Sequence, residues 1–252
     1  MLLELKRDVI YGPVHSRRIG RSLGVNILPA ETKLCTFDCL YCHFGWTGAH
    51  AASVPAGVGF RAADEILRAV REALETIDRP PECITFSGNG EPTLHPEFPE
   101  IARGVIALRD ELSPTSRTAI LSNSSTACDE TVRDALSLLD LRVMKLDCGD
   151  DETFGRFNRP CEGVTLDRIT EGLASIADVT VQALMAGGPG GNTGRAALDA
   201  WLARLEAIRP TKVQIYTLMR DHPSSGIEPV ARERLLGIAK MAELRCIRAE
   251  VF

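Results

Sequence analysis

Three cysteines lie within eight residues of one another. Cys35, Cys39 and Cys42 are separated by three and then two residues inside the segment Lys33 to Gly45. Three thiolates at this spacing can hold one face of a [4Fe–4S] cubane, which has four irons and so keeps one iron without a protein ligand. An open iron can bind a small molecule, as a catalytic zinc does at its open position. The spacing therefore predicts a ligand-binding iron–sulfur cluster in a loop over about residues 30–48.

Other readings of these cysteines explain less. A structural zinc site normally closes with four ligands, and the nearby fourth candidate, His43, adjoins Cys42 too closely for easy tetrahedral ligation. The run from Cys39 to His43 also matches the attachment pattern of c-type haem, but it leaves Cys35 unexplained. Three unrelated core cysteines would not be expected beside Asp38 and other polar residues.

Polar residues follow later apolar runs. Gly88-Asn-Gly-Glu-Pro92 comes directly after the run 83–86, and glycine there lets the backbone approach a ligand closely. Taken alone, this motif is also compatible with a strand-to-helix turn. Ser122 and Asn123 end the next run, where they can bind a ligand or cap the helix expected over 129–139.

Lys145 and Asp147 stand two residues apart at the end of another apolar run, so they share one face of a strand. A charged pair inside a barrel is costly unless it is paired or bound to a ligand. We therefore favour a catalytic role for both over a purely structural ion pair.

The composition fits a globular protein of one domain spanning residues 1–252. Of its residues 44% are hydrophobic and 25% charged, and the first ten include four charges rather than a signal peptide's apolar core. No apolar stretch approaches the roughly 20 residues of a membrane-spanning helix. Eight cysteines are then expected to stay reduced in a cytoplasmic protein. The net charge of −5 does not favour nucleic acid as a partner, although it does not exclude it.

The elements that must position these residues alternate between strands and helices. Short apolar or β-branched runs predict strands over 23–28, 83–86, 118–121, 142–146, 179–184 and 212–218. Helical periodicity predicts helices over 62–77, 97–111, 129–139, 165–176, 195–208 and 231–244, before a last strand over 246–251. The segments 49–59 and 186–194 are expected to be loops.

This alternation predicts an α/β fold of parallel strands, an incomplete (β/α)6 TIM-like barrel with an additional C-terminal helix and strand. In such barrels chemistry is carried by loops at the carboxyl ends of the strands. Each of the motifs described above falls on that rim.

The sequence resembles the radical S-adenosylmethionine (SAM) superfamily, whose signature is Cys-x3-Cys-x2-aromatic-Cys, here with Tyr41 as the aromatic residue. The stretch 11–26 further resembles a branch of iron–sulfur oxidoreductases distantly related to wyosine-type tRNA-modifying enzymes. With the later motifs, the resemblance covers nearly the whole chain.

The resemblance implies two cofactors, a [4Fe–4S] cluster held by the three cysteines and SAM bound at its open iron. By analogy with the family, the SAM site includes the glycine-rich motif after the second strand and two later strand ends. The residues assigned to it are Tyr41, Ser87, Gly88, Asn89, Gly90, Glu91, Ser122, Asn123 and Met185.

The resemblance also implies a reaction, in which a reductant such as flavodoxin or ferredoxin supplies an electron and a 5′-deoxyadenosyl radical abstracts hydrogen from a substrate. That substrate is a tRNA base, a glycyl-radical protein, or a small metabolite or peptide. Five residues are candidates for contacting it: Arg17, Arg18, Arg21, Cys148 and Cys161. The segment 150–160 is either a family segment that reaches toward substrate or an ordinary surface loop.

One alternative comes from a different functional class. An iron–sulfur electron-transfer or sensor protein would hold the cluster without cleaving SAM, but four cysteines would suit it better than three. The remaining thiols, Cys83, Cys128 and Cys246, are expected to be buried apolar residues.

Overall fold

A large, mostly parallel sheet forms the centre of the structure, a computed structural model that describes residues 2–51 and 57–252. Within these residues the sheet has nine strands, in the order β1-β2-β5-β6-β7-β8-β9-β11, with β10 paired to β8. The strands from β2 to β11 along this path are parallel, and β1 is antiparallel to β2. No pairing joins β1 to β11 in the described residues, so the sheet is an incomplete barrel, as predicted.

The predicted parallel strands are all present, with small changes in their ends. They are β2 (Gly20–Val25), β5 (Cys83–Phe86), β6 (Arg117–Ser122), β7 (Leu141–Lys145), β8 (Thr180–Gly187), β9 (Lys212–Thr217) and β11 (Ala249–Val251). The first is shifted by three residues from the expected 23–28, because its start pairs with β1 in a hairpin.

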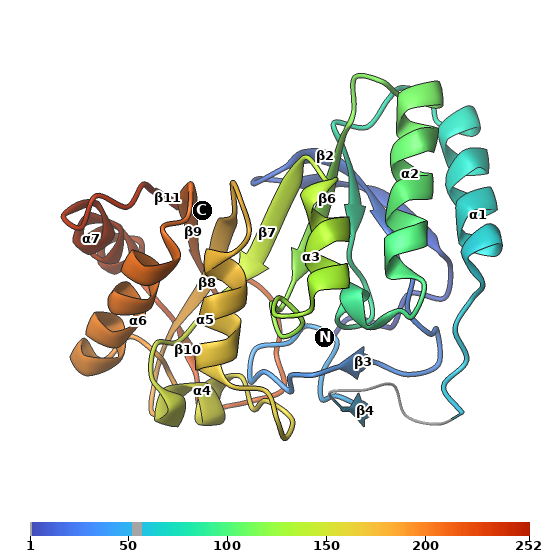
Figure 1. The fold of residues 1–252 in the computed structure, drawn as a ribbon. Coiled ribbons are helices and arrows are strands. Elements are labelled where there is room, and N and C mark those ends of the chain that lie inside the picture. The colour runs from blue at the N-terminus through green and yellow to red at the C-terminus, as the bar shows by residue number, and fades with distance from the viewer. Residues whose placement is uncertain (1, 52–56) are drawn as a thin grey trace.

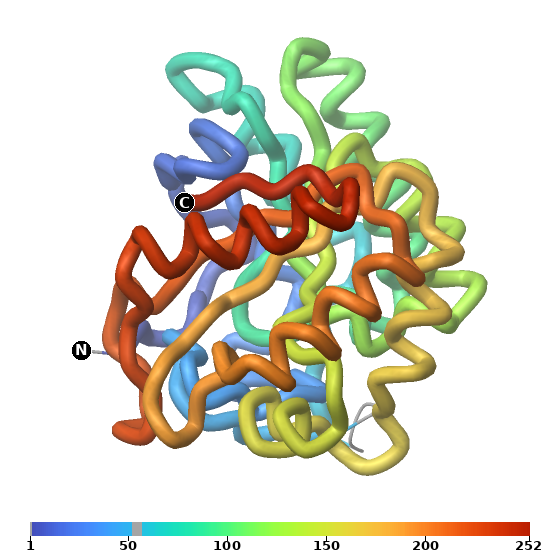
Figure 2. The backbone as a smooth tube through the Cα atoms, turned by 90° about the vertical axis from the view of Figure 1, so that its left-hand side faces the viewer, coloured from blue at the N-terminus to red at the C-terminus, as the bar shows by residue number. Residues whose placement is uncertain are grey.

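Six of the helices match the predicted periodic segments, and they cover the outer face of the sheet (Figure 1). They are α1 (Ala63–Thr76), α2 (Phe98–Leu112), α3 (Glu130–Ser137), α5 (Leu166–Ala174), α6 (Arg195–Ile208) and α7 (Arg232–Glu243). On α1 the buried residues Ile66, Val70 and Leu74 recur at helical spacing and face the core. In Figure 2, α6 and α7 (orange to red) lie in front of the strands on this outer face.

Several short elements were not predicted. They are β1 (Ile10–Ser16), β3 (Leu34–Cys35), β4 (Ala49–His50), the 3-10 helix η1 (Pro92–Leu94), α4 (Asp151–Phe157) and β10 (Glu228–Pro229). β1 contains Pro13 and lies at the edge of the sheet, the position where a strand tolerates proline. The expected loop 49–59 begins with β4, and its residues 52–56 lie outside the described part of the chain.

Helix α4 corrects the reading of 150–160 as an ordinary surface loop. Asp150 caps the helix by accepting from the Thr153 backbone N–H, and Phe154 and Phe157 are buried against the cysteine loop. Figure 1 shows α4, β3 and β4 together below the carboxyl ends of the strands.

The remaining cysteines only partly follow the prediction of burial. Cys83 is fully buried at the start of β5, but Cys128 is half-buried and Cys246 is exposed. Cys246 has a φ of 60° in the turn after α7, where the chain cannot pack it into the core. None of the helices in the described ranges is both long and apolar enough to cross a bilayer.

Candidate iron–sulfur and SAM site

The cysteine loop leaves the end of β2 and lies on the turn that follows β5. The Leu34 backbone N–H donates to the Asn89 carbonyl at 3.0 Å, and the Glu91 N–H donates to the Leu34 carbonyl at 3.0 Å. These bonds place Cys35, the last residue of β3, directly beside the glycine-rich motif.

Gly90 is required for this close approach. Its φ is +140°, and a Cβ added there would lie 1.7 Å from the Leu34 carbonyl oxygen. Gly88 has a φ of +144°, and its Cβ would lie 2.4 Å from Asn26 Oδ1. Both glycines therefore allow the turn to pack against protein backbone and side chain, a reason for glycine that applies before any ligand binds.

Two of the three cysteine sulfurs receive side-chain amide hydrogen bonds. Asn123 Nδ2 donates to Cys35 Sγ at 3.3 Å, and Asn158 Nδ2 donates to Cys39 Sγ at 3.4 Å. Cys35 and Cys39 are buried, while Cys42 is half-buried. The sulfurs thus lie in an interior site with directed N–H donors.

Burial makes ionisation of the metal-free thiols unfavourable. It raises the pKa of Cys35 to about 12, with a further contribution from Cys39, and raises that of Cys39 to about 11, with a contribution from Asp147. Bound iron would reverse this effect, because a coordinated thiol is deprotonated.

The donor set fits an iron–sulfur cluster. Three thiols come from one loop, and two of them meet N–H donors that stabilise anionic sulfur. In the described ranges no three His, Cys, Asp or Glu side chains are arranged around a single ion. His43, the zinc alternative's fourth ligand, instead lies against the Asp221 carbonyl at 3.5 Å.

Asp147 joins the cysteine loop to the sheet. Its Oδ2 accepts from the Tyr41 hydroxyl and from Asn158 Nδ2 at 2.8 Å, and its Oδ1 accepts from the Leu184 N–H at 2.8 Å. Lys145 Nζ lies 3.6 Å from Oδ1, and the Asp147 side chain has no exposed surface. With its acceptor positions occupied, this carboxylate is placed to hold Tyr41 rather than to take a proton from a substrate.

Lys145 lies in a cationic part of the barrel interior. Its Nζ donates to the Tyr216 hydroxyl at 3.1 Å and lies 5.1 Å from the centre of the Tyr41 ring. Burial alone would lower the pKa of Lys145, but Asp147 and Tyr216 outweigh burial and raise that pKa, so the ammonium stays protonated. The Arg18 guanidinium lies 4.6 Å from the centre of the Tyr216 ring and donates to Gln182 Oε1 at 2.7 Å.

Glu91 links two strand ends. Its Oε1 accepts from the Thr93 N–H at 3.1 Å, and its Oε2 accepts from the Asn123 N–H at 2.5 Å. Burial raises the pKa of this carboxyl, partly offset by these hydrogen bonds. Ser122 accepts from the Ser124 N–H at 2.9 Å, and Asp129, not Ser122 or Asn123, caps α3.

Other residues assigned to SAM from the sequence have different surroundings. Asn89 is fully buried, and its Nδ2 donates to the Lys6 carbonyl at 2.9 Å and the Pro29 carbonyl at 2.8 Å, so its amide holds the N-terminal segment. Ser87 Oγ lies 2.5 Å from the Tyr11 hydroxyl. Met185 is fully buried at the end of β8.

The candidate substrate residues are not brought together. Cys148 is buried, and its thiol donates to Asn158 Oδ1 at 3.3 Å; half-buried Cys161 donates its N–H to the Thr36 carbonyl at 2.9 Å. Arg17 is exposed in the turn between β1 and β2.

Arg21 does not fit the expectation that it meets a substrate near the cysteines. It lies near the start of β2, at the amino ends of the strands, where it donates to Asp78 at 2.8 Å. Arg21 lies at the amino end of this strand whether the strand begins at residue 20 or at the predicted residue 23, so it is on the rim opposite the cysteine loop.

We therefore expect Arg21→Ala to leave SAM binding unchanged and to cost about 1–2 kcal/mol of stability. The ion pair with Asp78, which is 77% exposed, is weak, but the guanidinium also donates to the Arg79 and Pro80 carbonyls. Calorimetry with SAM and thermal unfolding check this; a marked loss of SAM affinity would contradict the placement of Arg21.

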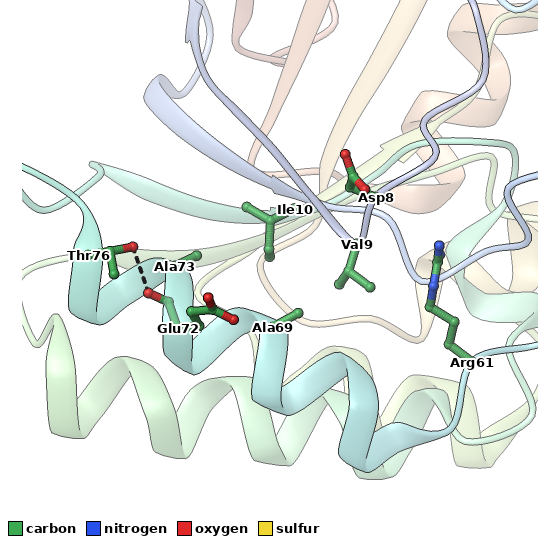
Figure 3. A pocket seen from close by; sticks show the side chains of 8 residues that line it. All are labelled: Asp8, Val9, Ile10, Arg61, Ala69, Glu72, Ala73 and Thr76. Atoms are coloured by element: carbon green, nitrogen blue, oxygen red, sulfur yellow. Dashed lines mark hydrogen bonds between the residues drawn. The ribbon is translucent and has the colours of Figure 1, made fainter.

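A surface pocket lies away from this site. It has a volume of about 420 Å³ and lies between α1 and the start of β1, lined among others by Asp8, Arg61 and Glu72 (Figure 3). None of its lining residues is a cysteine or belongs to the strand-end motifs.

Sequence reasoning included Asn158 only as part of the segment 150–160, and it did not single out Asn192 or Tyr216. Asn158 contacts Cys39, Tyr41 and Asp147, and Asn192 Nδ2 donates to the Asp147 and Leu184 carbonyls at 2.8 Å each. A polar residue near the end of a strand is only a weak sign of a role in the site. The contacts that show the role join residues far apart in the sequence, so the sequence does not reveal them.

Comparison with known proteins identifies the family of this chain. The profile of the radical SAM superfamily matches residues 32–198. A UPF0026 protein of Synechocystis sp. is 32% identical over 223 residues, covering 85% of this chain and 77% of the relative. A Brachyspira hyodysenteriae protein named "GTPase Obg" is 26% identical over 248 residues, and the chain spans 96% of its own length but only 35% of that relative.

Solved structures share the fold. TYW1 with a lysine-pyruvate adduct superposes with a TM-score of 0.62 at 14% identity, covering 89% of this chain and 73% of the other. Native anSMEcpe with bound AdoMet superposes with a TM-score of 0.61 at 16% identity, covering 90% and 63% of the two chains. The superfamily consists of enzymes that use a [4Fe–4S] cluster and SAM. With this profile match over most of its length, the chain belongs to the radical SAM superfamily.

Proposed function

We propose that this protein cleaves SAM reductively and uses the resulting radical on a substrate. The observation that carries the proposal is the buried loop with Cys35, Cys39 and Cys42 at the strand rim, where amide N–H groups meet two of the sulfurs. When bound, the cluster supplies the electron that cleaves SAM to methionine and a 5′-deoxyadenosyl radical, which abstracts hydrogen from the substrate.

The residues proposed for SAM divide by what their side chains already contact. The polar side-chain atoms of Glu91 and Asn89 bond to protein partners, so these residues hold the turn 87–91 in shape for SAM rather than bond to SAM directly. Tyr41, held by Asp147, fixes the end of the cysteine loop over the barrel interior.

We expect Glu91→Gln to destabilise the protein by about 1–3 kcal/mol and to weaken SAM binding, because the new NH₂ group would face backbone N–H donors. Thermal unfolding and calorimetry with SAM measure the two effects. Glu152→Gln is the control, since its side chain is 91% exposed. Unchanged SAM affinity in Glu91→Gln would remove Glu91 from the SAM site.

The interior cations indicate the character of the substrate. Protonated Lys145, together with Arg18 and Tyr216, forms a lining suited to a carboxylate or phosphate group. A tRNA carries phosphates beside its bases, and a glycyl-radical protein, a peptide or a small metabolite can carry a carboxylate. The net charge of −5 gives no long-range attraction toward a polynucleotide.

A partner must supply the electron, and we propose a reductant such as flavodoxin or ferredoxin in the cytoplasm. All eight cysteines are free, which suits a reducing compartment.

Electron paramagnetic resonance of the reduced, reconstituted protein tests the proposal. If SAM binds the open iron, adding SAM changes the spectrum of the cluster. A cluster whose spectrum is unaltered by saturating SAM would instead favour an electron-transfer or sensor protein.

A further inference from the structure

Two asparagine side chains approach the cysteine sulfurs from opposite parts of the fold. Asn123 follows β6 and is 8% exposed, and Asn158 ends α4 and is 1% exposed. Each directs its amide nitrogen at one sulfur, at 3.3 Å from Cys35 and 3.4 Å from Cys39. In the described residues no hydrogen bond reaches the Cys42 sulfur. Cys35 and Cys39 therefore differ from Cys42 in that a side-chain amide donates to their sulfurs.

The orientation of the Asn158 amide is fixed by its other partners. Its nitrogen lies 2.8 Å from Asp147 Oδ2, and an ionised carboxylate can only accept. Its oxygen accepts from the Cys148 thiol at 3.3 Å. A reversed amide would place its oxygen against the carboxylate, so the nitrogen must be on the side of Asp147 and Cys39. One of its hydrogens bonds to Asp147, and the other is shared between Cys39 Sγ at 3.4 Å and the Tyr41 hydroxyl at 3.2 Å.

The Asn123 amide is fixed in a different way. Its Oδ1 accepts from the Ser125 backbone N–H at 2.9 Å, and a backbone N–H can only donate. Its nitrogen then faces Thr36 Oγ1 at 2.7 Å as well as the Cys35 sulfur, and Thr36 donates its own proton onward to Ser125 Oγ. Two independent networks therefore direct N–H donors at sulfur.

An N–H donor stabilises a sulfur more strongly as the negative charge on that sulfur grows. Reduction adds an electron to a cluster, so such donors favour the reduced state and raise the reduction potential. The effect is larger in a buried site, where the dielectric constant is low. Both amides lie in such a site.

We propose that Asn123 and Asn158 are positioning residues that raise the reduction potential of the cluster through their hydrogen bonds to Cys35 and Cys39. This inference rests on the proposed function, because it requires the cluster. Cys148 then orients the Asn158 amide rather than meeting the substrate.

The test is an anaerobic redox titration of reconstituted Asn123→Leu, Asn158→Leu and the double variant, followed by electron paramagnetic resonance. Leucine is close in size to asparagine and lacks the donor. At a fixed potential, each single variant is expected to show about a tenfold lower ratio of reduced to oxidised cluster, which is about 59 mV for one electron. The double variant is expected to show a larger shift in the same direction.

Asn192→Leu is the matched control. Asn192 is also buried, at 2% exposure, and its amide bonds to the Asp147 backbone, but it contacts no cysteine sulfur. Its loss is expected to lower the unfolding temperature and to leave the potential unchanged. An equal shift in Asn192→Leu would show that any local loosening moves the potential, and would overturn the inference.

The iron and sulfide content of the protein shows whether a negative result contradicts the proposed function or only this inference. A wild-type protein that binds no cluster would overturn the proposed function and this inference with it. A full cluster whose potential is unchanged in both single variants would overturn the inference alone. If Asn158→Leu holds no cluster, the Asn123→Leu titration decides, because its network shares no hydrogen bond with that of Asn158.

Discussion

Replacing Cys39 by alanine is expected to abolish the cluster. Cys39 lies in the centre of the loop, its sulfur is buried, and the remaining Cys35 and Cys42 could hold only two irons. Reconstitution with iron and sulfide should give roughly four irons per chain in the wild type and close to none in Cys39→Ala. Iron analysis and the visible absorption spectrum measure this loss, and SAM cleavage should disappear with it.

Cys246→Ala provides the control for this experiment. Cys246 is exposed in the turn after α7, remote from the cysteine loop in the sequence, and it takes part in none of the hydrogen bonds described for the site. It should keep the full iron content. A Cys39→Ala protein with wild-type iron and sulfide would exclude this loop as the site of the cluster.

Gly90→Ala is expected to be the most damaging substitution outside the cysteines. The new Cβ would lie 1.7 Å from the Leu34 carbonyl oxygen, and the φ of +140° is strained for any residue with a side chain. Strain and overlap together should cost at least about 3 kcal/mol, or roughly 6–12 °C in unfolding temperature for a chain of this size. Because Leu34 adjoins Cys35, cluster content should fall as well.

The control for Gly90 is Gly194→Ala. Gly194 precedes α6 with a φ of −62°, and no atom lies within 4 Å of the position of its Cβ. The free energy of unfolding of Gly194→Ala should differ from that of the wild type by no more than about 0.5 kcal/mol, as for an ordinary surface substitution. Equal stability of Gly90→Ala and the wild type would show that the cysteine loop does not pack on the turn after β5 as described.

The barrel could be predicted because its elements carry local signals. The apolar spacing on α1 and the short β-branched runs of β5 and β6 are visible within one turn or strand, so their positions were confirmed to within a few residues. β1 could not be predicted in the same way, because Gly12 and Pro13 interrupt its run of strand-forming residues. Its extended conformation depends on pairing with β2. α4 was uncertain because only its packing on the cysteine loop shows that Phe154 and Phe157 are core residues.

The candidate site was predictable where its residues are close in sequence. The cysteine spacing and the Lys145 and Asp147 pair could be recognised directly. The roles of their neighbours could not, because the contacts of Asn158 with Cys39 and Asp147 depend on how α4 folds back onto the loop. In the folded chain the Asp147 carboxylate also accepts hydrogen bonds from the Tyr41 hydroxyl and the Leu184 N–H. Neither the charge of Asp147 nor the strand periodicity predicts these contacts.

The most direct test of the central claim is cleavage of SAM itself. The protein is reconstituted anaerobically with iron and sulfide, reduced with dithionite and given SAM, and the products are separated by chromatography. We expect 5′-deoxyadenosine and methionine to form together in the wild type and neither to form in Cys39→Ala. A reduced, fully loaded cluster that leaves SAM intact would contradict this expectation.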